Sequence, residues 1–97
     1  MTIIRVFRAR AKPGLVEALE QRLREEAVPG VAAADGLVAY HAGRPHGDSR
    51  DFLMITVWKD LVAVHAFAGE NYEHPVLYGD TAELIEEMSL DHYEGVE

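Results

Sequence analysis

The sequence contains no cysteine, and this absence excludes a group of chemistries. Disulfide bonds, thiolate nucleophiles and cysteine-ligated metal sites all require that side chain. Long apolar runs are also absent, and none approaches the ~20 residues that a membrane-spanning helix needs. The first residues, Met1 to Arg5, lead directly into a predicted strand, with no basic segment followed by an apolar core. We therefore expect no signal peptide and a cytoplasmic protein.

Basic residues are scarce. Nine Lys and Arg face 17 Asp and Glu, which gives a formal net charge of −8. A nucleic-acid-binding protein needs a clustered basic surface to neutralise phosphates, and an anionic membrane surface attracts cations rather than anions. We therefore expect neither nucleic acid nor membrane as a partner. The acidic residues concentrate near the end of the chain, and we interpret them as a solvated face.

The 97 residues predict a single domain, 1–97, with one modest core. Its most specific stretch begins with an almost continuous apolar run from Phe52 to Trp58, which is typical of a buried strand. After Asp60 the spacing becomes helical, with an expected apolar face of Leu61, Val64, His65 and Ala68. Asp60 is placed to cap the first turn of that helix, and Gly69 follows where the helix would stop.

The remaining segments complete a simple order of elements. Alternation predicts a first strand that ends at Arg10, and the spacing of Leu15, Leu19 and Leu23 predicts a helix ended by Pro29-Gly30. The other expected segments are strand 36–43, turn 44–50, a short helix over 70–78 interrupted by Pro75, one or two turns over 81–87, and strand 88–94. This β-α-β-β-α-β order predicts an α+β, ferredoxin-like fold with a four-stranded antiparallel sheet.

The first and third strands carry apolar residues on both sides. Helices in this arrangement cover only one face of the sheet, and no unused segment remains to cover the other. A second copy of the chain is the natural cover. The sequence therefore predicts a homodimer with its two sheets face to face.

This organisation, with Val57-Trp58, Ala66-Phe67-Ala68-Gly69-Glu70 and the terminal His92-Tyr93-Glu94, resembles the antibiotic biosynthesis monooxygenase-like family. The resemblance covers nearly the whole chain and implies the dimeric α/β-barrel form of the ferredoxin-like fold. Some family members oxygenate aromatic polyketides or quinols without flavin or metal. Others bind and degrade heme, and many have no known substrate.

The resemblance implies a cofactor-independent monooxygenase that acts on a planar phenolic or quinol substrate held in a dry, aromatic-walled pocket. In this hypothesis the catalytic residues are His65, Asn71 and Trp58, and no cofactor or metal is expected. Residues that would bind the substrate or line its pocket are Trp58, Phe67, Tyr72, His74, Tyr78 and His92.

Each of these residues also has a structural interpretation. Trp58 could be core, His65 a core or interface histidine, Asn71 a cap after Gly69, and His92 a packing residue. Two other functions stay open. Whether the chain is an enzyme is therefore open as well. One is a heme-binding or heme-degrading protein with His74 near the metal, although the first strand lacks the asparagine of such enzymes. The other is a non-catalytic dimer that binds a small ligand or has a stress-related function.

Overall fold

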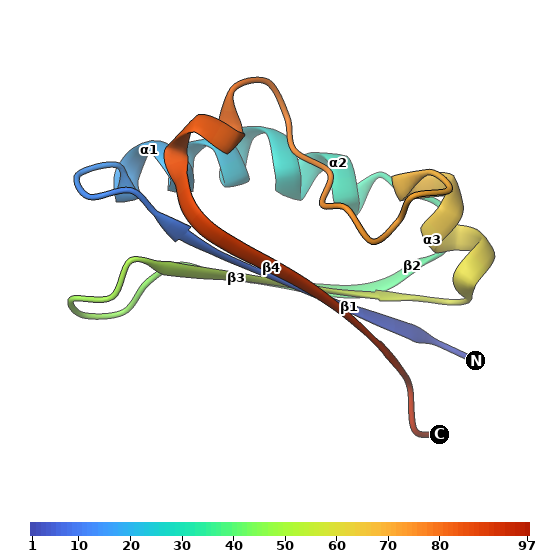
Figure 1. Cartoon of the computed structure of the whole chain (residues 1–97). Coiled ribbons are helices and arrows are strands. Elements are labelled where there is room, and N and C mark those ends of the chain that lie inside the picture. The colour runs from blue at the N-terminus through green and yellow to red at the C-terminus, as the bar shows by residue number, and fades with distance from the viewer.

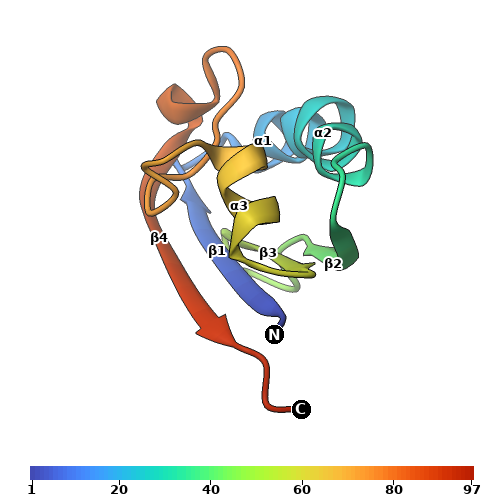
Figure 2. The same cartoon turned by 90° about the vertical axis from the view of Figure 1, so that its right-hand side faces the viewer.

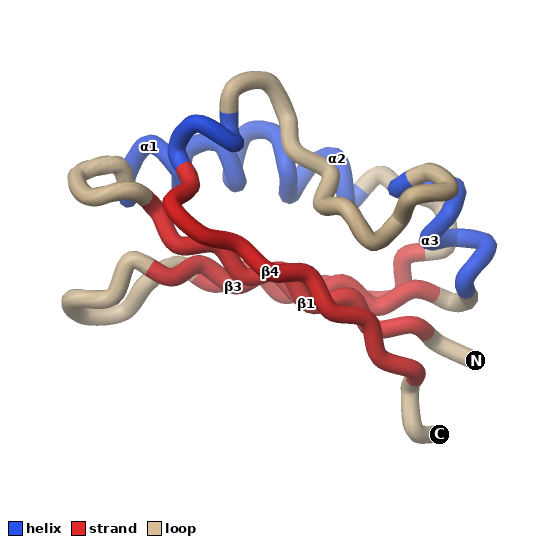
Figure 3. The backbone as a smooth tube through the Cα atoms, viewed as in Figure 1, coloured by secondary structure: helices blue, strands red, loops and turns tan.

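The computed structural model describes residues 1–97 as one antiparallel sheet with every helix on one of its faces (Figures 1 and 3). The sheet order is β2-β3-β1-β4. This confirms the predicted β-α-β-β-α-β fold. The elements are β1 (Ile3–Ala11), α1 (Val16–Arg22), the π-helix η1 (Leu23–Ala27), α2 (Val28–Ala32), β2 (Leu37–Gly43), β3 (Asp51–Trp58), α3 (Leu61–Ala68), the 3₁₀ helix η2 (Thr81–Leu84) and β4 (Ile85–Glu94).

The strand registers decide which side chains meet beneath the helices. Arg5 of β1 lies opposite Thr56 of β3 and opposite His92 of β4. Directly opposed residues of antiparallel strands point to the same face, so these three side chains share the helix-covered side. Phe7 follows two residues later, opposite Met54 and Leu90.

The core consists of two apolar clusters, both on the helix-covered side. One gathers Leu19, Ala9, Ala11, Phe52 and Ile85 towards one end of β1. The other gathers Trp58, Ile3, Ala63 and Val64 towards the other end. Arg5 and Phe7 lie between these clusters on β1, so the middle of the sheet is where space remains.

The first helix runs further than the sequence predicts. Pro29-Gly30 was expected to end it, but α2 includes both residues and continues to Ala32. Pro29 falls in the first turn of α2, directly after the π-helix η1. A proline is tolerated there because its missing N–H is not needed in a first helical turn, and the wider π-turn changes the hydrogen-bond register just before it.

The helix α3 begins and ends as predicted but presents a different face. Asp60 Oδ1 accepts a hydrogen bond from Ala63 N at 2.9 Å, and Gly69 ends the helix with φ of 84°. The buried residues are Ala63 and Val64, whereas Leu61 is 42% exposed, so Leu61 was wrongly assigned to the inner face. A Cβ on Gly36 would lie 2.5 Å from the Ala63 Cβ, so glycine there permits this close approach.

The segment from Gly69 to Asp80, called the cover below, contains no helix or strand. The predicted helix over 70–78 is therefore wrong. His74 N donates to Asn71 O in a turn, and Pro75 then supplies no N–H with which a helix could continue. In two perpendicular views the cover runs along the helix layer near β4 (Figures 1 and 2). No helix of the protein is long and apolar enough to cross a membrane.

Candidate functional site

Two adjoining cavities of about 40 Å³ each lie between the sheet and the helix layer. We call them the Leu19 cavity and the Arg5 cavity, after a residue that lines only one of them. Both are closed on one side by Val76 and Tyr78 of the cover. The remaining shared wall residues are Phe7, Ala27 and Met54.

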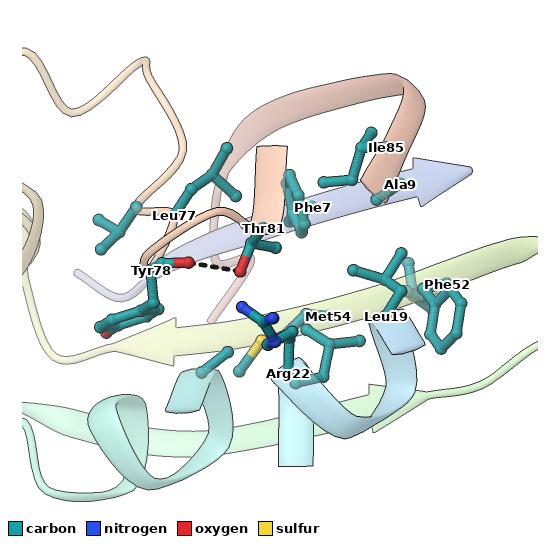
Figure 4. Close-up of a pocket in the computed structure, with 14 residues that line it drawn as sticks. Phe7, Ala9, Leu19, Arg22, Phe52, Met54, Leu77, Tyr78, Thr81 and Ile85 are labelled. Carbon is teal, nitrogen blue, oxygen red and sulfur yellow. Dashed lines mark hydrogen bonds between the residues drawn. The ribbon is translucent and has the colours of Figure 1, made fainter. Parts of the chain in front are cut away.

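The Leu19 cavity has almost wholly apolar walls (Figure 4). The hydroxyl of Thr81 donates to Tyr78 O at 2.5 Å. The Arg22 side chain, also at the wall, is paired with Asp80 of the cover. This cavity therefore offers mainly apolar volume.

The Arg5 cavity differs because two buried polar residues, Arg5 and Thr56, help to line it. Each side chain is only 5% exposed, and the β1–β3 register places them opposite one another. Phe67 of α3 and Leu90 of β4 add apolar wall. An apolar cavity with a few convergent polar groups is the usual form of a small-molecule site.

Arg5 is held by two elements at once. Its Nη1 donates to Tyr72 O at 2.5 Å and lies 2.9 Å from His92 Nε2, while its Nη2 donates to His74 O at 3.2 Å. Tyr72 and His74 belong to the cover, so Arg5 ties the cover to the middle of the sheet. Arg22 of α1 ties the far end of the cover through Asp80.

The contact with Arg5 determines the state of His92. A guanidinium only donates, so His92 Nε2 accepts and the neutral ring carries its proton on Nδ1. Burial and, next, the charge of Arg5 lower the pKa of His92 below its ordinary value. Burial also lowers the pKa of Arg5, although an arginine stays protonated in proteins. His92 is therefore a neutral acceptor at pH 7.

Trp58 acts on this site through Thr56. Its side chain is fully buried in the core, and its Nε1 donates to Thr56 Oγ1 at 2.9 Å. Because the Thr56 oxygen receives this bond, its own hydroxyl proton is left to donate elsewhere. Trp58 also packs against Phe67, with ring centroids 4.9 Å apart.

A row of rings leads from Arg5 towards α3. The Tyr72 ring meets His92 edge-on at 5.0 Å and meets the His65 ring on its other side at 5.0 Å. The structure thus brings together three of the predicted residues, His65, Tyr72 and His92. It also places Phe67 and Tyr78 in the cavity wall, as expected of wall residues.

Of the predicted residues, only Phe67 and Tyr78 line the two cavities, whereas Trp58, His65, Tyr72 and His92 line neither. The same holds for the last two predicted residues. Asn71 and His74 are exposed residues of the cover, and their backbone carbonyls rather than their side chains make the hydrogen bonds described above. The catalytic, binding and pocket-lining roles predicted for the eight residues stay predictions. No group of three or more His, Asp or Glu is placed to hold a metal ion.

Sequence reasoning missed Arg5 and Thr56. The sequence did contain a signal for Arg5. In the alternation of β1, Arg5 falls among the inward-facing residues together with Ile3, Phe7 and Ala9. A charged residue at an inward position of a central strand is rarely buried without a purpose.

Comparisons with known proteins agree with this fold. The model of a family described as "Antibiotic biosynthesis monooxygenase" matches residues 2–72. The solved structure of PA3566 from Pseudomonas aeruginosa is 25% identical, with a TM-score of 0.75 over 99% of this chain and 95% of that one. Rv0793 from Mycobacterium tuberculosis is 17% identical, with a TM-score of 0.78 over 100% and 97%.

A third solved structure is a mutant of SnoaB, described as a cofactor-independent oxygenase from Streptomyces nogalater. It is 15% identical, with a TM-score of 0.75 over 99% of this chain and 94% of that one. No curated protein matches the sequence. The family match spans well over half of the chain, so this protein belongs to the antibiotic biosynthesis monooxygenase family.

Proposed function

We propose that this protein is a cofactor-independent monooxygenase that acts on a small planar phenol or quinol. The observation that carries the proposal is the Arg5 cavity, whose apolar walls surround two buried polar side chains. Membership of the family supports it, as does the shared fold with a protein described as a cofactor-independent oxygenase.

The substrate supplies all four electrons that reduce O₂. A deprotonated phenol passes an electron to O₂, and the two radicals combine to form a carbon–oxygen bond. The hydroperoxide then loses water and leaves a carbonyl at the attacked carbon. One oxygen atom enters the product and the other leaves as water, so no external reductant is required. The protein must exclude bulk water, orient the ring and stabilise the developing oxyanion.

Substrate entry requires the cover to move. A cavity of ~150 Å³ is needed to hold a single benzene ring, whereas each cavity here measures about 40 Å³. The cover contains no helix or strand, and it closes both cavities through Val76 and Tyr78. Displacement of the cover would join the two cavities and admit a ring system.

The residues then take distinct roles. Phe67, Tyr72 and Tyr78 form aromatic walls, and Trp58 positions Thr56. When Arg5 turns to the substrate oxygen, His92 Nε2 is released and receives the phenolic proton directly or through water, with His65 beyond Tyr72 in the row of rings. Asn71 and His74 reach the substrate only as the cover closes over it.

The working form is proposed to be a homodimer. The face of the sheet without helices carries Ile4, Ile55 and Val57, which stay partly exposed, and no helix covers it (Figure 1). A second copy, sheet to sheet, would bury this apolar surface.

The proposal is tested by oxygen uptake with anthrone, a tricyclic ketone whose enol tautomer is a phenol and whose oxygenation to anthraquinone releases one water. In ¹⁸O₂ with a metal chelator present, we expect one labelled oxygen atom per product. Phe67→Ala should lower the rate about tenfold or more by removing wall packing, whereas Val62→Ala, on the exposed side of α3, should not. Because anthrone also autoxidises, the rates are compared with a control without protein, and no excess of labelled product over that control with either anthrone or 1-naphthol would refute the function.

A further inference from the structure

Arg5 is a buried cation without a carboxylate partner. The protein has six ion pairs, and none includes Arg5. Its side chain nevertheless lies in the interior, where burial lowers its pKa. Buried charges in proteins are usually paired, because an unpaired buried charge loses its hydration and gains no interaction that compensates for it.

The groups around Arg5 solvate its charge without neutralising it. Tyr72 O, His74 O and His92 Nε2 are all uncharged acceptors. These contacts use three of the five N–H donors of the guanidinium. The Nε–H makes no hydrogen bond within the protein, and one Nη2–H is likewise left over. Because Arg5 lines the Arg5 cavity, its positive charge and these two donors are available to a ligand that enters there.

Thr56 supplies a third donor beside them. Its oxygen accepts a hydrogen bond from Trp58 Nε1, and the register sets Thr56 beside Arg5 on the neighbouring strand, where both residues line the same cavity. A cation and a hydroxyl proton that converge from neighbouring strands match the lone pairs of one anionic oxygen.

We propose that Arg5 and Thr56 form an oxyanion-recognition site, which binds the phenolate or carboxylate oxygen of a planar aromatic ligand. This proposal adds a binding site to the proposed function. It rests on the proposed function only for the identity of the ligand that the protein converts. Phe7, Met54, Phe67 and Tyr78 supply the apolar walls against which the ring packs. The preference for an anion must come from the groups that line the cavity, because the net charge of −8 repels anions from the chain as a whole.

Ligand binding is then coupled to the cover. An anionic oxygen is a stronger acceptor for a guanidinium than a backbone carbonyl, so it competes with Tyr72 O and His74 O for the Nη groups. An entering anion therefore loosens the very contacts that hold the cover against the sheet.

The test compares two redox-inert probes of the same shape, 2-naphthoate and the neutral 2-naphthamide, by isothermal titration calorimetry. A hydrogen bond to a charged group is worth about 1.5–3 kcal/mol, so the protein should bind the naphthoate about 10- to 100-fold more tightly than the amide. Arg5→Met and Arg5→Gln should abolish this preference and leave the affinity for the amide within about twofold. Lys12→Gln removes the same charge from an exposed residue and should keep the preference.

Arg5→Gln retains a donor for the cover carbonyls, so it decides the question if Arg5→Met does not fold. Equal binding of both probes by the wild-type protein, or a preference that persists in the folded Arg5 variants, would overturn the inference. Neither probe is oxygenated, so this outcome is independent of the ¹⁸O₂ experiment. A protein that prefers naphthoate but leaves anthrone unlabelled retains the oxyanion site and loses the oxygenase function.

Discussion

Arg5 has two sets of partners that compete for one guanidinium. In the structure it holds the carbonyls of Tyr72 and His74 and the ring of His92. In the proposed complex it holds the ligand oxygen instead. A cation with only neutral acceptors suits this exchange, because a resident carboxylate would bind it too strongly for a ligand to displace.

His92 links this cluster to pH. Burial, and then the charge of Arg5, lower its pKa in the folded protein, so between that pKa and about 6.5 the unfolded chain binds more protons. Its contribution to stability is complete above about pH 6.5 and is lost as the pH falls towards the lowered pKa. We therefore expect the free energy of unfolding, measured with urea, to fall over that window, and His92→Gln to flatten the change.

His46 provides the matched control. It is an exposed histidine in the loop between β2 and β3, so His46→Gln should leave the pH dependence of unfolding as it is in the wild type. If His92→Gln retained the full slope below pH 6.5, the ring would not be held neutral by Arg5, and its proposed role as proton acceptor would fail as well.

At the scale of elements, the cover is the least regular part of the helix-covered side. It is tied at one end by Arg5 and at the other by the pair between Arg22 and Asp80. Between these ties, Tyr78 packs against α2 so closely that a Cβ on Gly30 would lie 2.5 Å from its hydroxyl oxygen. These contacts hold the cavities closed in the absence of ligand.

Removing a tie should loosen the cover without unfolding the sheet. In Arg22→Met, amide hydrogens of the cover should exchange faster with solvent deuterium, while those of β1 and β3 exchange as in the wild type. Hydrogen–deuterium exchange with mass spectrometry resolves these segments. Arg24→Met is the matched control, since Arg24 pairs with Glu20 on the same helical stretch and has no contact with the cover. Equal exchange in both variants would show that the Asp80 pair does not hold the cover.

At the scale of the whole molecule, the helices protect one face of the sheet and leave the other uncovered (Figure 2). Ile55 lies near the middle of this second face, paired with Val6 on β1 and His41 on β2. Tyr93, on β4, is exposed on the same side. A partner sheet would convert this half-covered apolar layer into a second core.

A charge placed on that face should separate the proposed dimer. Ile55→Asp and Tyr93→Asp are both expected to shift the mass measured by light scattering from two chains to one, because an unpaired carboxylate is costly to bury. Val62→Asp adds the same charge to the 77% exposed residue of α3 and should not change the mass. A wild-type protein that is monomeric at micromolar concentration would contradict the dimer directly.

The sequence was sufficient for features that depend on neighbours along the chain. The alternation in β1 and β3, the Asp60 cap and the stop at Gly69 are short-range effects of side-chain spacing and backbone freedom. These features, together with the order of elements, determined the fold. The family resemblance rested on local motifs too, and the match over residues 2–72 confirms it.

Tertiary structure decided what depends on residues distant in the chain. Arg5 meets Tyr72, His74, His92 and Thr56 only because strand register and the path of the cover bring them together. Trp58 is committed to Thr56 by the same packing, and the cover runs without a helix because Pro75 and its ties to the sheet outweigh local propensity. Spacing along a sequence specifies which face a residue occupies. The partners it meets there, and hence the uncommitted charge of Arg5, are set by the three-dimensional fold.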